Sequence, residues 1–170
     1  MDTGGMTATV AETAAFYEHI RSGDGAFKFL CNGEWRVSTS GAVCENVNPS
    51  KANAPCFQFQ ACTPAEVDEA YATAKVAHKT WARTPLHKRA HILHKAAELM
   101  RRHQGPMADA MVLEIAKAAK DAKTEVVRSA DLLDYTAEEG MRLLGQGKLL
   151  NSDSFPGSER NKLCMVTKVP

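Results

Sequence analysis

Arg128 is the side chain in this sequence that is best suited to hold an anionic ligand. It lies near the middle of the segment DAKTEVVRSADLLDYTAEEG, residues 121–140. A guanidinium is always charged and presents a planar fork of donors, which matches the oxygens of a phosphate. Glu125 and Asp131 lie three residues before and after it. Arg128 is therefore either a ligand-binding residue or a surface arginine paired with these two acids.

Three histidines have the spacing to share one helix face. His87, His91 and His94 follow one another at intervals of four and three residues, a pattern that can hold a metal ion. The basic residues beside them are Lys88, Lys95, Arg101 and Arg102. Because a cation-rich neighbourhood disfavours a further cation, we expect a solvated basic face and no metal.

The cysteines do not indicate a disulfide framework or a zinc site. Their number is odd and they form no CxxC pair; they are Cys31, Cys44, Cys56, Cys62 and Cys164. We expect all five to be reduced, buried, small hydrophobic side chains. The sequence also lacks the GxSxG, GxxxxGK[ST], GxGxxG and HExxH motifs, so it contains no self-sufficient active site.

The composition is that of one soluble globular domain. Of the 170 residues, 44% are hydrophobic and 24% are charged, and the net charge is +1. This balance does not produce the positive field that nucleic-acid binding needs. No apolar run is long enough to span a bilayer, and the first residues do not resemble a secretory signal. We therefore expect a cytoplasmic protein that binds neither nucleic acid nor membrane.

Three β-favouring stretches precede the helices. Residues 1–26 are small and polar and predict a flexible N-terminal arm. Residues 27–37 surround the turn signal Asn32-Gly33, and the two further stretches span residues 42–49 and 56–63. Together they predict a small antiparallel meander.

Four helices are predicted between residues 63 and 144. The first begins with a capping box, with Thr63 at the N-cap, Pro64 at the first position and Glu66 three residues after the cap. Its apolar stripe runs through Val67, Ala70, Tyr71, Ala74 and Trp81. The next two helices cover residues 84–105 and 106–120.

The fourth helix, which contains Arg128, has two apolar strips. The main one consists of Ala122, Val126, Ala130, Leu133, Ala137, Met141 and Leu144, and Arg128 faces away from it. Leu132, Tyr135 and Leu143 lie on the far side. A helix with two strips is usually covered on both faces, so Arg128 is expected beside a seam or cleft.

Residues 145–170 predict two strands around the polar turn PGSER. The last strand stops at Pro170 without a polar tail, so we expect the chain to be the front part of a longer protein.

The order of these features resembles the amino-terminal part of the aldehyde dehydrogenase superfamily. The stretches AKAAKDAKTEVVRSADLLDYTAEEG and SDSFPGSER carry the resemblance most specifically, and it extends from about residue 27 to residue 170. The branch with the greatest similarity is the NADP-dependent, non-phosphorylating one of plants and green algae. That branch oxidises glyceraldehyde 3-phosphate to 3-phosphoglycerate.

The resemblance implies an α/β fold of which this chain supplies only the front. Residues 27–144 would form the meander and a four-helix layer, and residues 145–170 would begin the β arm of the oligomerisation region. The doubly wound nucleotide-binding core would be largely missing, together with the catalytic Cys, the Glu and the oxyanion Asn of the family. No catalytic or NADP-binding residue is therefore assigned in this chain. NADP as cofactor and a homotetramer in the full-length form are implied by the resemblance alone.

One functional position of the family matches a residue of this chain. The arginine of the family's EVVR element is associated with the substrate phosphate, and here it is Arg128. The sequence departs from many members at Ala116-Lys117-Ala118, where they have a Gly-Lys-Pro-like turn. Two alternatives remain: a non-catalytic fragment or interaction module that assembles with full-length subunits, and an aldehyde dehydrogenase of other specificity in which Arg128 forms only salt bridges.

Overall fold

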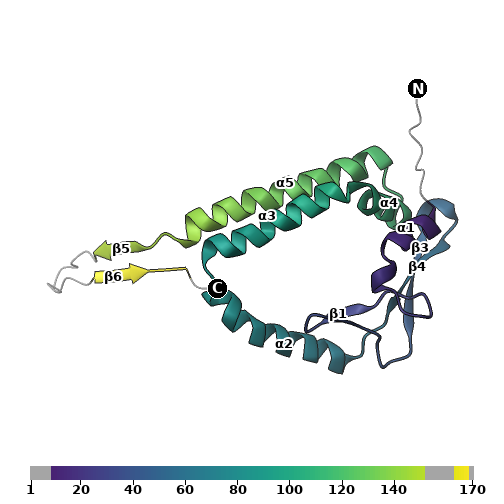
Figure 1. The fold of residues 1–170 in the computed structure, drawn as a ribbon, viewed down its shortest axis with the longest axis horizontal. Coiled ribbons are helices and arrows are strands. Elements are labelled where there is room, and N and C mark those ends of the chain that lie inside the picture. The colour runs from purple at the N-terminus through teal and green to yellow at the C-terminus, as the bar shows by residue number, and fades with distance from the viewer. Residues whose placement is uncertain (1–8, 152–162, 169–170) are drawn as a thin grey trace, which may run out of the picture.

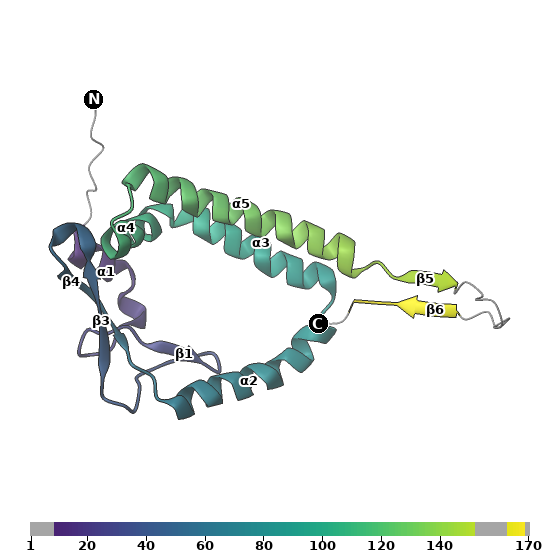
Figure 2. The same ribbon diagram turned by 180° about the vertical axis from the view of Figure 1, so that it is seen from behind.

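The computed structural model describes residues 9–151 and 163–168 of the chain, and Figures 1 and 2 show their arrangement from opposite sides. The helices are α1 (Val10–Phe16), α2 (Pro64–Arg83), α3 (Leu86–Arg102), α4 (Gln104–Ile115) and α5 (Ala119–Leu144), with short 3-10 turns at Glu18–Ile20 and Pro49–Lys51. The strands are β1 (Phe29–Cys31), β2 (Glu34–Arg36), β3 (Val43–Asn48), β4 (Ala54–Gln60), β5 (Lys148–Asn151) and β6 (Leu163–Val166).

All four predicted helices are present, as α2 to α5. The capping box of α2 is confirmed: the Thr63 hydroxyl accepts from the Glu66 backbone N–H, and the Glu66 carboxylate accepts from the Thr63 N–H. Further donors from the preceding loop, above all the Thr39 backbone N–H, keep the pKa of Glu66 at about 2. The Glu66 carboxylate thus satisfies the Thr63 amide at the helix start and also holds the loop before it through Ser38 and Thr39.

The prediction of one continuous meander is wrong. The strands form separate two-stranded antiparallel sheets, β1 with β2 and β3 with β4. The loop between β2 and β3 is held by α2 and does not continue the pairing. Ser38 is buried and donates its hydroxyl to Glu66 at 2.7 Å, and the Thr39 N–H donates to Glu66 at 2.7 Å. These bonds tie the loop to the start of α2, and β2 does not pair with β3.

The helical core is built around the antiparallel pair α3 and α5, which lie side by side in both views (Figures 1 and 2). Ala90 and Ala97 of α3 are buried, and so are Ala130 and Ala137 of α5. Small side chains let two helix backbones approach closely, so the alanine stripe determines which face of α5 is turned inward. Near its start, α5 also packs on α4 through Val126.

Part of the stretch expected to be an N-terminal arm is helical. A capping box of Thr9 and Glu12 begins α1, which packs against α4 and β4. Thr13 and Ala14 of this helix are buried, and Ala14 joins a cluster with Phe57 and Leu113. The short helix therefore helps to close the end of the molecule where β3, β4 and α4 lie.

The apolar stripe of α2 is not covered by the described part of the chain. None of its residues is buried, and Tyr71 is 77% exposed. The predicted strand pair after α5 is confirmed as the antiparallel hairpin of β5 and β6, which extends away from the helices (Figure 1). The predicted turn PGSER lies outside the described residues. In the described ranges, no helix combines the length and apolar character that crossing a bilayer requires.

Candidate functional site

Arg128 lies on the outward face of α5. The inward face is the predicted one, since Ala122, Val126, Ala130 and Ala137 are all buried. Arg128 is two residues from Val126 and two from Ala130, so the helical repeat turns its side chain away from α3 and α4. The guanidinium is exposed as a consequence.

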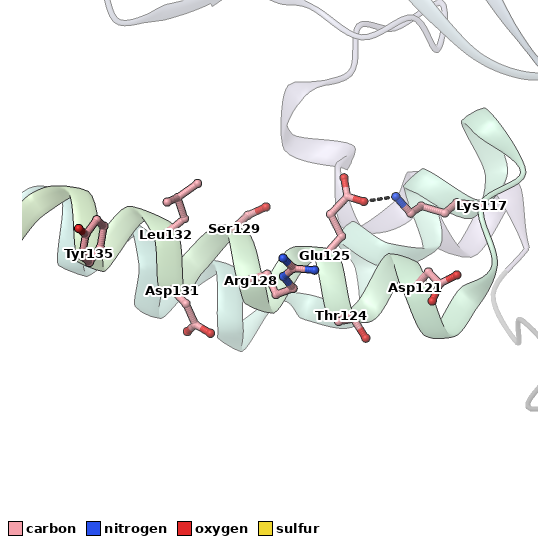
Figure 3. A pocket seen from close by; sticks show the side chains of 9 residues that line it. All are labelled: Lys117, Asp121, Thr124, Glu125, Arg128, Ser129, Asp131, Leu132 and Tyr135. Atoms are coloured by element: carbon pink, nitrogen blue, oxygen red, sulfur yellow. Dashed lines mark hydrogen bonds and ion pairs between the residues drawn. The ribbon is translucent and has the colours of Figure 1, made fainter.

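An open depression of about 880 Å³ runs along this outward face (Figure 3). Most of its lining comes from α5, and one residue comes from the linker that precedes the helix. The lining residues are Lys117, Asp121, Thr124, Glu125, Arg128, Ser129, Asp131, Leu132 and Tyr135. The combination of two cations, hydroxyl groups and one aromatic ring suits a small polar ligand with an anionic group.

The two acids nearest to Arg128 in sequence pair with other cations. Glu125 forms an ion pair with Lys117, the dashed contact in Figure 3. Asp131 pairs with Arg101 of α3 at 2.7 Å. Within residues 9–151 and 163–168, no hydrogen bond or ion pair reaches the guanidinium of Arg128. The alternative in which Arg128 pairs with Glu125 and Asp131 is therefore not the arrangement that the structure adopts.

The linker between α4 and α5 explains the position of Lys117. Ala116 has the left-handed backbone conformation, with φ of 55°, and forms the C-cap of α4. This turn brings the side chain of Lys117 beside the first turns of α5. Many family members were expected to have glycine here, which adopts such a conformation without steric cost. In this chain Ala116 adopts the left-handed conformation at that position.

The prediction that α5 is covered on both faces is not met by the described residues. Leu132 is 63% exposed and Tyr135 is 64% exposed. Only Leu143 of the second apolar strip is partly buried. The depression around Arg128 is therefore a surface feature of this chain, and it is not a closed cleft.

His94 has a structural role that the sequence did not reveal. Its Nδ1 lies 2.7 Å from Asp134 and its Nε2 lies 3.0 Å from Glu138, both on α5. These carboxylates, Asp134 foremost, raise the pKa of His94. His94 and then Arg101 in turn lower the pKa of Asp134.

This arrangement corrects the expectation of a solvated basic face. His87 and His91 are exposed, as that expectation required, but His94 joins α3 to α5. Among the described residues, no group of His, Cys, Asp and Glu could hold a metal ion. Asp134 and Glu138 are four residues apart and share a helix face. This spacing is the feature of the sequence that could have indicated a shared partner such as His94.

The comparisons with known proteins agree with the sequence motifs. A model of the aldehyde dehydrogenase family matches residues 35–170. The chain belongs to this family. It is 57% identical over 144 residues to an NADP-dependent glyceraldehyde-3-phosphate dehydrogenase of Triticum aestivum, covering 85% of this chain and 29% of that protein. It is 53% identical over 161 residues to the protein of that name from Zea mays, covering 95% and 32% of the two chains.

A solved structure of the family has a fold similar to that of this chain. The NADP-dependent glyceraldehyde-3-phosphate dehydrogenase of Bacillus halodurans C-125, solved with NADP, has a TM-score of 0.75 and is 32% identical to this chain. The alignment covers 84% of this chain and 29% of that one. The α/β fold class and the aldehyde dehydrogenase resemblance are confirmed. The chain spans about a third of the length of the curated relatives it matches.

The strand arrangement of the described residues differs from that of a dinucleotide-binding sheet. Strand pairs in the described part are all antiparallel hairpins, whereas a dinucleotide site needs the edge of a parallel sheet followed by helices. No residue of this part is assigned to the cofactor.

The cysteines show no sign of a catalytic function in this family member. Cys31 and Cys56 are buried as expected, and burial raises the pKa of Cys56. Cys44, Cys62 and Cys164 are exposed, so the expectation of five buried thiols is wrong for these three. Cys44 lies in β3, Cys164 lies in β6, and Cys62 lies in the connection between β4 and α2. None of the five lines the depression around Arg128.

Proposed function

We propose that this chain is the phosphate-recognising part of an NADP-dependent, non-phosphorylating glyceraldehyde-3-phosphate dehydrogenase. The complete enzyme would oxidise the aldehyde of glyceraldehyde 3-phosphate to 3-phosphoglycerate, with NADP accepting the hydride. The observation that carries the proposal is the 57% identity to the Triticum aestivum protein of that name. The glyceraldehyde-3-phosphate dehydrogenases of Zea mays, Nicotiana plumbaginifolia and Apium graveolens are each 53% identical, which supports the same substrate class.

Arg128 is the residue we assign to the substrate. Its guanidinium is exposed in a polar depression and has no partner among the described residues. A phosphate dianion can accept two parallel hydrogen bonds from such a fork, and this pairing is stronger than a neutral hydrogen bond. Phosphate recognition of this kind holds one end of the triose and leaves the aldehyde free for the reacting groups.

The reacting groups themselves belong to the rest of the enzyme. In this proposal the nucleophilic Cys, the Glu that activates water and the oxyanion Asn are contributed by the other two thirds of the family fold. The 170-residue chain is then inactive by itself. A homotetramer and a cytoplasmic location are parts of the same proposal.

A chimeric enzyme tests the proposal. Residues 27–170 of this chain would replace the matching segment of the Triticum aestivum relative, which supplies the remaining parts. We expect NADPH formation with glyceraldehyde 3-phosphate, and a much lower kcat/KM with unphosphorylated glyceraldehyde. The unaltered Triticum aestivum protein is the matched control.

Two outcomes would contradict this proposal. A folded chimera that oxidises the two aldehydes equally well would show that the segment does not select for phosphate. Turnover by the isolated 170-residue chain would show that the reacting groups lie within it.

A further inference from the structure

Arg128 has two acidic neighbours that would bind it in an isolated helix. Oppositely charged residues three positions apart on a helix surface are within reach of each other, and Glu125 and Asp131 both have this spacing. A carboxylate on the guanidinium would have to be displaced before a phosphate could bind. An anion-binding arginine in this sequence therefore needs a means of keeping both acids away.

Lys117 engages the first acid. Its ammonium forms an ion pair with Glu125 across the depression, while Arg128 lies on the other side of that glutamate (Figure 3). The lysine side chain is 30% exposed and the glutamate side chain is 49% exposed, so the lysine is the better anchored partner. It comes from the linker, and its position depends on the left-handed turn at Ala116.

Arg101 engages the second acid. It lies on α3 and reaches Asp131 at 2.7 Å and Asp134 at 2.6 Å. In Figure 3 the Asp131 carboxylate points away from the Arg128 guanidinium. Two cations from outside α5 thus hold the two acids that flank Arg128.

We infer that Lys117 and Arg101 are positioning residues that occupy Glu125 and Asp131 and so keep Arg128 open for the substrate phosphate. The inference rests on the proposed function. It assigns a role in phosphate selectivity to side chains that act through a neighbouring carboxylate. An exposed ion pair that competes with the ligand weakens its binding only a few-fold, so we expect an effect of about two- to fivefold on KM.

Lys117→Met in the chimeric enzyme is the direct test. We expect the KM for glyceraldehyde 3-phosphate to rise about two- to fivefold because Glu125 becomes free to pair with Arg128. The kcat and the kinetics with unphosphorylated glyceraldehyde should stay unchanged. Lys117→Arg should keep the original KM. Lys120→Met is the matched control, since Lys120 is an exposed lysine three residues later, at the start of α5, that does not line the depression.

A second substitution distinguishes positioning from direct phosphate contact. In Lys117→Met with Glu125→Gln, no carboxylate competes for Arg128, so the KM should return to its original value. A loss that persists in the double variant would mean that Lys117 itself binds the phosphate, and it would overturn the inference. An unchanged KM in Lys117→Met would also overturn it.

Arg128→Leu separates this inference from the proposed function. If that variant loses selectivity for the phosphorylated aldehyde while Lys117→Met is silent, only the inference fails. If Arg128→Leu lowers kcat/KM equally for both aldehydes, Arg128 does not bind the substrate phosphate, and the proposed function fails as well.

Discussion

One long face of α5 is buried and the opposite face is exposed. The inward face buries Ala122, Val126, Ala130 and Ala137 against α3 and α4, while the outward face exposes Arg128, Leu132 and Tyr135. Both faces carry apolar side chains, so hydrophobicity alone does not distinguish them. The four buried positions are alanine or valine, which allow two helices to approach closely, whereas Leu132 and Tyr135 on the outward face are large and exposed.

The charges differ in the same way between the two faces. Along the edge that faces α3, Asp131, Asp134 and Glu138 all have a partner on α3, either Arg101 or His94. On the outward face Lys117 is paired, whereas Arg128 has no partner in the described ranges. An exposed guanidinium without a partner in the described ranges is available to bind an anion.

The largest expected effect is on the inward face. Ala130→Leu would force a larger side chain into the contact between α3 and α5, where Ala130 is fully buried. We expect the free energy of unfolding of the 170-residue chain to fall by about 1–3 kcal/mol. Urea denaturation followed by circular dichroism measures this loss.

Its matched control is the adjacent residue on the outward face. Ser129 is exposed, and Ser129→Leu should change the free energy of unfolding by no more than about 0.5 kcal/mol. Equal losses in the two variants would contradict the division of α5 into a packed face and an open one.

A smaller change in the free energy of unfolding is expected from a substitution in the linker that carries Lys117. Ala116 has a left-handed backbone with φ of 55°, which disfavours a residue with a Cβ. Ala116→Gly removes this cost and should stabilise the chain by up to about 1 kcal/mol in urea denaturation. A loss of stability would mean that the alanine is not strained in this turn.

The ion pairs of the inward edge should respond to pH. The pKa of His94 is raised above its ordinary value near 6.5, chiefly by Asp134. Its contribution to stability is thus fully present below that ordinary value and is lost as pH rises through the raised pKa. We expect a histidine NMR titration to give a pKa above 6.5 for His94, and His94→Gln to remove the associated decline in stability. A pKa at or below the ordinary value would contradict the pairing.

The smallest change in stability is expected for substitutions of the outward apolar residues. Leu132→Ser should leave the free energy of unfolding of this chain within about 0.5 kcal/mol of its starting value, because Leu132 is 63% exposed. A larger loss of stability would show that Leu132 packs against another part of the chain.

Local signals predicted much of the fold. The capping box at Thr63, Pro64 and Glu66 located the start of α2, and the helical repeat of Ala122, Val126, Ala130 and Ala137 identified the buried face of α5. Both depend on interactions within a few residues. The sequence did not predict the split of the strands into two hairpins. The loop between them is held by a contact that no local pattern shows, from Ser38 to Glu66, 28 residues later.

The surroundings of Arg128 were only half predictable for the same reason. Its position on the outward face follows from the helical repeat. Its lack of a partner among the described residues does not follow from the repeat, because Arg101 reaches Asp131 from another helix and Lys117 reaches Glu125 through a turn at Ala116. Spacing along α5 alone favoured the opposite result, with both acids on Arg128. Which cation pairs with each acid depends on residues from other elements, so a short sequence motif does not predict it.

The selectivity of Arg128→Leu in the chimeric enzyme tests the central claim most directly. We expect kcat/KM for glyceraldehyde 3-phosphate to fall about 10–150-fold, the cost of losing a charged hydrogen bond to the phosphate. The same variant should oxidise unphosphorylated glyceraldehyde almost as well as the parent enzyme. Equal losses with both aldehydes, or no loss with either, would contradict the assignment of Arg128 to the phosphate.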